Sequence, residues 1–221
     1  NNTSAKAALD IALHDLVAKS MHQPLYKFLG GGKPELKILT TVSVKAVAEM
    51  VSDAQLFVAQ GFETLKIKVG LNPAEDIQRL KAIREAVGDS ISILSDANQG
   101  WDAKSALQII DSLAAQNLGI AMVEQPVKAW DYANLKYVRD NSRIPIYADE
   151  SAFNLRDVSK IIQAQMADGI NIKLMKSGGL YAARPIYDLA TSHNLPCMAG
   201  CMLESPIGLA AMAAFVVGKS N

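Results

Sequence analysis

Two lysines separated by a single apolar residue, Lys66 and Lys68, lie in the segment TLKIKV at residues 64–69. This segment is typical of a buried strand, and residues two apart in a strand point to the same side. Lysine is almost never fully buried without a partner, so two lysines on one face need an explanation. Either they form the wetted face of an edge strand, or they belong to a polar site.

Further charged residues stand at the ends of later apolar segments. They are Asp96 in ISILSDANQGW, Glu124 in MVEQP, Asp149 in IYADES and Lys173 in INIKLMKSGG, spaced 24 to 28 residues apart. Three converging carboxylates repel one another in a half-buried site, so a cation is needed to hold them together. Oxygen ligands without Cys or His favour a hard ion, and we expect Mg²⁺ at the three carboxylates. The alternative is an accidental row of solvated charges.

The hydrophobic pattern that must position these residues alternates between strands and helices. A first helix is expected over 4–19, with Ser4 as its N-cap, and Pro24 and Gly30–Gly32 then mark a loop. The apolar stripe of this helix consists of Leu9, Ala12, Leu13, Leu16 and Val17. Strands are expected over 38–44, 64–69, 91–97, 120–124, 144–149, 169–174 and 195–202. Each is followed by a helix, over 47–60, 73–87, 103–116, 132–140, 155–165, 180–193 and 207–218.

Seven β-then-α units without a hairpin signal indicate an all-parallel sheet with crossover helices. No linker interrupts them, so we expect one domain over 1–221, with a leading helix and loop at 1–32 and the seven units at 33–221. A doubly wound open sheet and a (β/α)8 barrel both fit, and seven consecutive units favour the barrel. The expected fold class is α/β, a TIM-like (β/α)7β barrel whose eighth strand follows Asn221.

Barrel geometry places the charged residues at one mouth, where βα loops build active sites. Strands 2 and 6 are opposite in a ring of eight, so Lys68 and Lys173 are expected to face each other beside the metal. A substrate carboxylate on the metal would hold its α-carbon between the two amines. One lysine would remove the α-proton, the metal would stabilise the resulting enediolate, and the other lysine would return a proton to the opposite face.

Composition limits the other functions. The chain has 22 Lys and Arg residues together and 22 Asp and Glu residues together, so its formal net charge is zero. This balance gives no excess of positive charge that would indicate binding to nucleic acid or an anionic membrane. No apolar run approaches the length of a membrane span. Cys197 and Cys201 form neither a zinc signature nor a disulfide framework, and the expected location is the cytoplasm.

The motifs LKIKVG, SDANQGW, VEQP, ADES and NIKLMKSGG, in this order, resemble the enolase superfamily and, within it, the muconate-lactonizing subgroup. The resemblance covers nearly the whole chain. It implies the same Mg²⁺ ligands and the same two acid/base lysines. It further implies that Lys66 stabilises the substrate carboxylate or enediolate. Asn98 and Glu150 would support the metal ligands, although both also fit as plain hydrogen-bonding residues.

Within this subgroup, DANQGW, VEQPV, ADESAF and INIKLMKSGGL resemble dipeptide epimerases such as the L-Ala-D/L-Glu type. We expect the protein to be an isomerase that epimerises dipeptides. The alternatives are that it is an o-succinylbenzoate synthase, a muconate cycloisomerase or a metal-binding barrel without catalytic activity. Substrate contacts would fall on Thr41 (equally a strand filler), Lys66, Cys201, Met202 and Leu203. The N-terminal capping domain and the eighth strand of the family are absent from this segment. The habit of the family implies a homo-oligomer that acts on a small-molecule substrate.

Overall fold

The computed structural model describes residues 2–32, 36–217 and 219. The chain forms two compact units with their own strands and helices. The central unit comprises Ile38–Ser151 and Ala164–Asp168. The terminal unit comprises Asn1–Lys37, Ala152–Gln163 and Gly169–Asn221.

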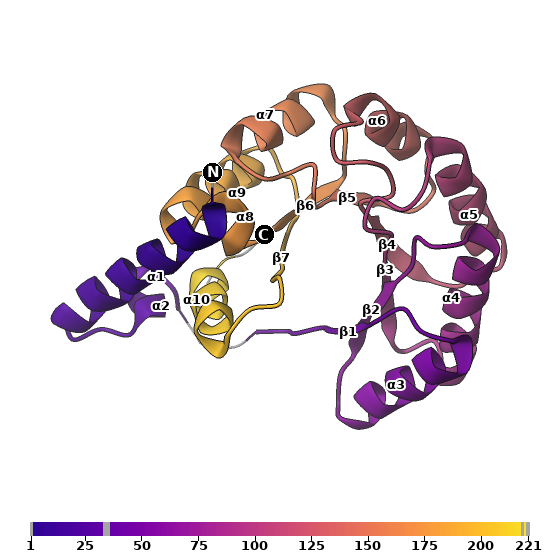
Figure 1. Cartoon of the computed structure of the whole chain (residues 1–221), viewed down its shortest axis with the longest axis horizontal. Helices are drawn as coiled ribbons and strands as arrows, with labels where there is room; N and C mark the ends of the chain where they lie inside the picture. Colours follow the sequence, from indigo (N-terminus) through magenta and orange to yellow (C-terminus); the bar gives the residue numbers. More distant parts are fainter. Residues whose placement is uncertain (1, 33–35, 218, 220–221) are drawn as a thin grey trace. The chain divides into compact units, whose positions relative to one another are not determined.

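The central unit alternates strands with helices. Its elements are β1 (Thr40–Val42), α3 (Val47–Ala59), β2 (Thr64–Lys68), α4 (Pro73–Val87), β3 (Ser92–Asp96), α5 (Ala103–Ala115), β4 (Ile120–Glu124), α6 (Tyr132–Asn141) and β5 (Ile146–Ala148). Strands β1 to β5 pair in sequence order, and every pairing is parallel. Helices α3 to α6 lie on one side of these strands (Figure 1). This is the arrangement that parallel strands require, because each must be reached by a crossover connection.

The side chains of β2 show how the sheet separates its core from its polar side. Leu65 and Ile67 are fully buried, as is Ile83 on α4. Because successive residues of a strand point to opposite faces, Lys66 and Lys68 project from the other side of β2. The apolar face therefore packs towards the helices, and the lysine face is left for the site.

Local capping explains where α4 begins and ends. The Asn72 side chain accepts hydrogen bonds from the N–H groups of Ala74 and Glu75, and Pro73 occupies the first helical position. Gly88 ends the helix with a φ of +76°, a conformation that glycine adopts readily. The Asn72 cap thus ends the loop that joins β2 to α4, and Gly88 ends the helix.

The terminal unit combines both ends of the chain. Its elements are α1 (Thr3–Ser20), α2 (Leu25–Phe28), α7 (Leu155–Ala164), β6 (Gly169–Ile172), α8 (Leu174–Ser177), α9 (Leu180–Ser192), β7 (Cys197–Ala199) and α10 (Pro206–Val216). Strands β6 and β7 pair in parallel, and α1 packs against α8, α9 and α10 (Figure 1). The Asp10 carboxylate of α1 accepts from the N–H groups of Leu180 and Tyr181 and so caps α9.

Helix α1 differs from its expected form in two ways. Its N-cap is Asn2, not Ser4, because the Asn2 side chain accepts from the Ala5 N–H at 3.0 Å. The expected stripe is exposed rather than buried; its large side chains, 43 to 70% exposed, are Leu9, Leu13, Leu16 and Val17. The buried residues of this helix are Ala7, Ile11 and Ala18. Helix α1 therefore packs through a face of mainly small side chains.

The remaining differences concern element ends. The strands expected over 38–44 and 195–202 are limited to β1 and β7. The strand expected over 169–174 ends at Ile172, because the chain turns into α8, a short helix that no sequence pattern indicated. The helix expected over 207–218 is α10; Gly218, like 33–35 and 220–221 of the expected domain, lies outside the described residues. Among the helices of the described ranges, none has the length and apolar character that crossing a membrane requires.

Candidate metal centre

The register of the sheet brings the predicted site residues of the central unit together. Lys68 pairs with Asp96, and Asp96 with Glu124, across β2, β3 and β4. Paired residues of neighbouring parallel strands lie side by side with their side chains on one face. Tyr147 of β5 pairs with Glu124, and Asp149 follows two residues later on the same face. These residues thus meet at the carboxyl ends of the strands.

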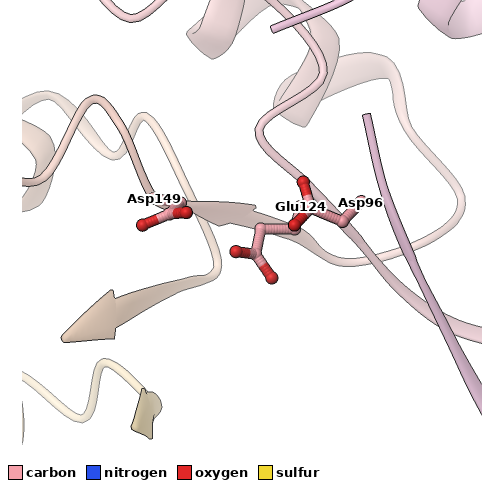
Figure 2. A group of neighbouring side chains, drawn as sticks. All are labelled: Asp96, Glu124 and Asp149. Carbon is pink, nitrogen blue, oxygen red and sulfur yellow. The ribbon is translucent and has the colours of Figure 1, made fainter. Parts of the chain in front are cut away.

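The three predicted metal ligands form one cluster. One oxygen from each of Asp96, Glu124 and Asp149 lies within 4.8 Å of the others. Figure 2 shows the three side chains in a row, with Glu124 between the other two. All three are buried, with exposures of 0, 0 and 1%. Such a group of oxygen donors could hold a hard metal ion.

Both lysines of β2 contact this cluster. The Lys66 ammonium lies 2.8 Å from Asp96 Oδ2 and 2.7 Å from Glu124 Oε2. Lys68 Nζ donates to Asp96 Oδ2 at 2.6 Å. The Lys66 side chain is 8% exposed and that of Lys68 is 27% exposed, so Lys68 is the one that solvent reaches. The wetted-edge interpretation of this lysine pair is therefore wrong, because both ammonium groups are bound to buried carboxylates.

Burial and neighbouring charges shift two pKa values in the cluster. Burial, followed by repulsion from Asp96, raises the pKa of the Glu124 carboxyl to about 7, although the Lys66 ammonium lowers it. Burial by itself would lower the pKa of Lys66, but attraction to Glu124 and Asp96 outweighs it and the pKa is raised. The Lys66 and Lys68 ammonium groups thus contact a group of three buried carboxylates. The all-oxygen donor set fits a divalent hard ion.

Asn98 connects Lys68 to the loop after β5. Its Oδ1 accepts from Lys68 Nζ at 2.6 Å, and its Nδ2 donates to Glu150 Oε1 at 3.0 Å. Its backbone N–H donates to Asp96 Oδ1 at 3.0 Å. Asn98 has a φ of +41°, a left-handed conformation that asparagine tolerates better than most residues. Asn98 and Glu150, which we expected to support the metal ligands, are therefore hydrogen-bonded to each other, and Asn98 also contacts the predicted ligand Asp96.

A buried carboxylate that the sequence analysis did not single out joins two loops of the site. Asp76, in the first turn of α4, is fully buried. Its Oδ2 accepts from the Gly70 N–H at 2.8 Å and from Trp101 Nε1 at 3.0 Å, and its Oδ1 accepts from Arg79 at 2.9 Å. Acidic residues are common in the first turn of any helix, so no sequence signal separated Asp76 from an ordinary capping charge.

The other predicted site residues are placed as follows. Thr41 of β1 pairs with Lys66 of β2, so its side chain shares the lysine face of the central unit. Lys173 lies in the terminal unit, where it follows β6 directly, caps α8 and is 7% exposed. The exposed residues that follow β7 in the same unit are Cys201, Met202 and Leu203. The central unit thus brings together the three carboxylates, both lysines of β2, Asn98 and Glu150.

Curated relatives resemble nearly the whole chain. The chain is 45% identical over 218 residues to an L-Ala-D/L-Glu epimerase from Clostridium acetobutylicum, covering 99% of this chain and 61% of the relative. It is 42% identical over 219 residues to a hydrophobic dipeptide epimerase from Enterococcus faecalis, with the same two coverages. The chain therefore spans about three fifths of the length of the curated relatives it matches.

Solved structures show the fold. A substrate-liganded complex of the L-Ala-D/L-Glu epimerase from Bacillus subtilis matches with a TM-score of 0.97 at 45% identity, over 99% of this chain and 61% of that one. The Enterococcus faecalis dipeptide epimerase, complexed with Mg and the dipeptide L-Leu-L-Tyr, matches with a TM-score of 0.97 at 41% identity, over 100% of this chain and 62% of that one. These matches confirm the expected α/β, TIM-like fold class.

Two family models divide the chain between them. Residues 1–30 match the N-terminal domain of mandelate racemase / muconate lactonizing enzyme. The leading helix, which we expected to belong to the barrel domain, is thus similar to part of that N-terminal domain. Residues 49–221 match the second model, which covers most of the chain and all three clustered carboxylates. The chain accordingly belongs to the enolase C-terminal domain-like family, within the enolase superfamily.

Proposed function

We propose that this protein catalyses Mg²⁺-dependent abstraction of the proton α to a carboxylate, and that its reaction is the epimerisation of dipeptides such as L-Ala-D/L-Glu. The observation that carries the proposal is the contact between the ammonium group of the partly exposed Lys68 and a buried group of three carboxylates. A hard cation beside an amine is suited to deprotonating a carbon acid. The dipeptide epimerases among the relatives, one of them solved with Mg and a dipeptide, support the substrate class.

Asp96, Glu124 and Asp149 would hold the Mg²⁺ ion. When bound, the ion draws electron density from a substrate carboxylate and so acidifies the adjacent C–H. As the proton leaves, the substrate becomes an enediolate, and its negative charge develops beside the β2 lysine face. The Lys66 ammonium is held there between two carboxylates, at 2.8 and 2.7 Å, where it can stabilise that charge without moving.

Lys68 would move the proton on one face of the α-carbon. Two of its three N–H groups are oriented by the acceptors Asp96 Oδ2 and Asn98 Oδ1, both at 2.6 Å, and this orients the third. Lys173, at the corresponding end of β6, would serve the opposite face; this part of the proposal is supported by its position in the family motif INIKLMKSGG. Asn98 and Glu150 would fix Lys68 and the loop after β5.

The proposal also covers the parts of the molecule that recognise the substrate. Thr41 shares the face of Lys66, and the exposed segment 201–203 follows β7, so both are retained as candidate substrate contacts. We further propose that the enzyme works in the cytoplasm as a homo-oligomer and binds neither nucleic acid nor membrane.

The test is exchange of the α-proton with solvent. The full chain is incubated in D₂O with MgCl₂ and a panel of L-Ala-L-Glu, L-Leu-L-Tyr and N-succinyl-L-Arg, the last because a Bacillus cereus relative is an N-succinyl-L-Arg/Lys racemase. The expected result, followed by NMR, is one α-deuterium per turnover and the appearance of the epimer, both lost with EDTA. Absence of deuterium from every compound refutes the proposal, and turnover of an o-succinylbenzoate synthase or muconate cycloisomerase substrate would reassign the same site to elimination or ring closure.

Single-lysine variants separate the two acid/base roles. If Lys68 and Lys173 serve opposite faces, each Lys→Ala variant loses epimerisation while the remaining lysine still exchanges the α-proton of one epimer. The two variants are therefore expected to exchange opposite epimers. Lys136→Ala is the matched control, because Lys136 is a half-exposed lysine paired with Asp140 on α6. Epimerisation that survives in either active-site variant would show that the lysine concerned is not an acid/base group.

A further inference from the structure

Gln125 stands where the chain segments that follow β3, β4 and β5 meet, beside the three clustered carboxylates. It follows Glu124 directly, it is fully buried, and its φ is +38°, a left-handed conformation uncommon for residues other than glycine. Its backbone N–H donates to the Tyr147 carbonyl of β5 at 2.8 Å, and its carbonyl accepts from the Gln99 N–H in the loop after β3 at 2.8 Å. The main chain at Gln125 is therefore bonded to both neighbouring strand ends.

The Gln125 side chain uses its full hydrogen-bonding capacity on the loops after β4 and β5. Its Oε1 accepts from the backbone N–H groups of Asp149 at 2.9 Å and Ser151 at 3.0 Å. Its Nε2 donates to the Val127 carbonyl at 2.9 Å and to Ser151 Oγ at 2.9 Å. A primary amide offers two acceptor sites and two donors, so every one is engaged.

The hydrogen bonds of Gln125 hold the chain beyond the point where the pairing of β4 with β5 ends. The pairing of β4 with β5 ends at Glu124 with Tyr147, and β5 itself ends at Ala148. Asp149 lies beyond the strand, so its N–H is held by the Gln125 amide instead of by a strand carbonyl. The Asp149 carboxylate must be kept close to two other carboxylates that repel it, which requires a backbone that does not swing away.

We propose that Gln125 is a positioning residue: it sets the Asp149 carboxylate against Asp96 and Glu124 and thereby sets the affinity of the site for Mg²⁺. The inference rests on the proposed function, because it assumes that these carboxylates bind the ion. Groups that orient metal ligands from outside the coordination shell typically change metal affinity by about 10- to 100-fold when they are removed. Gln125 holds its ligand through the main chain rather than through the carboxylate itself.

The opposite end of β5 provides a matched control. There Asp168 Oδ2 accepts from the Ile146 N–H at 2.9 Å, and Asp168 Oδ1 pairs with Arg139 at 2.8 Å. Asp168 thus performs the same kind of side-chain-to-backbone anchoring on the same strand, but away from the carboxylates. A variant at Asp168 weakens β5 without touching the loop that carries Asp149.

The experiment titrates Mg²⁺ into the full chain by isothermal calorimetry and records urea unfolding of the same samples. Gln125→Met keeps the length of the side chain and loses all four hydrogen bonds. Gln125→Asn keeps the amide but shortens it, and it carries the test if Gln125→Met does not fold. Both are expected to bind Mg²⁺ at least about 10-fold more weakly than the unmodified protein, and Asp168→Ala is expected to bind within about twofold of it.

The outcomes separate this inference from the proposed function. Folded Gln125 variants that bind Mg²⁺ as tightly as the unmodified protein overturn the inference and leave the proposed function standing. An equal loss in Asp168→Ala also overturns it, because the effect is then one of general stability. If the unmodified protein itself binds no Mg²⁺, the metal site of the proposed function fails and the inference falls with it.

Discussion

Replacing Lys66 by Met tests whether this lysine is an internal counter-ion that a metal ion can partly replace. Its ammonium lies 2.8 and 2.7 Å from two carboxylates that are fully buried, and its own side chain is only 8% exposed. Removing one partner of such a buried pair leaves uncompensated charge and typically costs about 3–5 kcal/mol of unfolding free energy. We therefore expect Lys66→Met to lose about 3–5 kcal/mol in the absence of divalent ions.

Magnesium should change the size of that loss. Without Lys66, Glu124 loses that ammonium contact and Asp96 retains the contact with Lys68, so the cation meets less competition and Mg²⁺ should bind the variant more tightly than the unmodified protein. Groups in one network typically couple by about 0.5–3 kcal/mol, and a coupling of 1.4 kcal/mol corresponds to a tenfold tighter Kd. Epimerisation should nevertheless be lost, because the substrate charge no longer has the Lys66 ammonium beside it.

The assay is urea unfolding of both proteins with EDTA and with saturating MgCl₂, combined with a calorimetric Kd for Mg²⁺. Lys45→Met is the control: Lys45 pairs with Asp53 at 2.7 Å on the surface of the same unit, so no dependence on Mg²⁺ is expected. A loss for Lys66→Met that is identical in EDTA and in Mg²⁺, or weaker Mg²⁺ binding by the variant, would refute the counter-ion argument.

Two further predictions concern the backbone and the thiols. Gly70→Ala should destabilise the fold by more than about 3 kcal/mol, because a Cβ there would lie 2.1 Å from the Ala97 carbonyl oxygen and φ is +104°. The control Gly61→Ala should cost about 1 kcal/mol, because φ is +93° there but the space around it is open. Equal urea midpoints for the two variants would contradict the steric explanation. Burial raises the pKa of Cys197 to about 12, so at pH 8 only about one of its thiols in 10⁴ is ionised. The exposed Cys201 should therefore release one fast equivalent from Ellman's reagent, and two fast equivalents would show that Cys197 is not shielded.

The order of strands and helices could be predicted because each element is marked locally. Apolar runs indicate the strands, and caps such as Asn72 and Gly88 mark the ends of α4. Helix α8 could not be predicted, because four residues give no periodicity. The buried face of α1 was missed for a different reason. Its contact side holds Ala7 and Ala18, so it is chosen by close packing against the neighbouring helices and not by hydrophobicity.

The carboxylates of the site could be predicted because each ends a strand and parallel register brings strand ends together. The groups that hold them could not. Gln125 is a single polar residue between Glu124 and Pro126, and its type alone indicates no role. Asp76 looks like an ordinary acidic residue of a first helical turn. Their roles depend on partners in other loops, at Asp149 and Trp101, which no sequence spacing specifies.

The two lysines of β2 occupy different positions relative to the carboxylates, and these positions suit the different roles proposed for them. Lys68 is level with Asp96 in the register and is 27% exposed, so its ammonium stands at the edge of the cluster. Lys66 lies two residues earlier, and its ammonium lies between Asp96 and Glu124, where its side chain is only 8% exposed. A base must exchange protons with substrate and solvent, whereas a counter-ion must keep its charge. The partly exposed Lys68 fits the first requirement, and the buried Lys66, whose pKa is raised by the two carboxylates, fits the second.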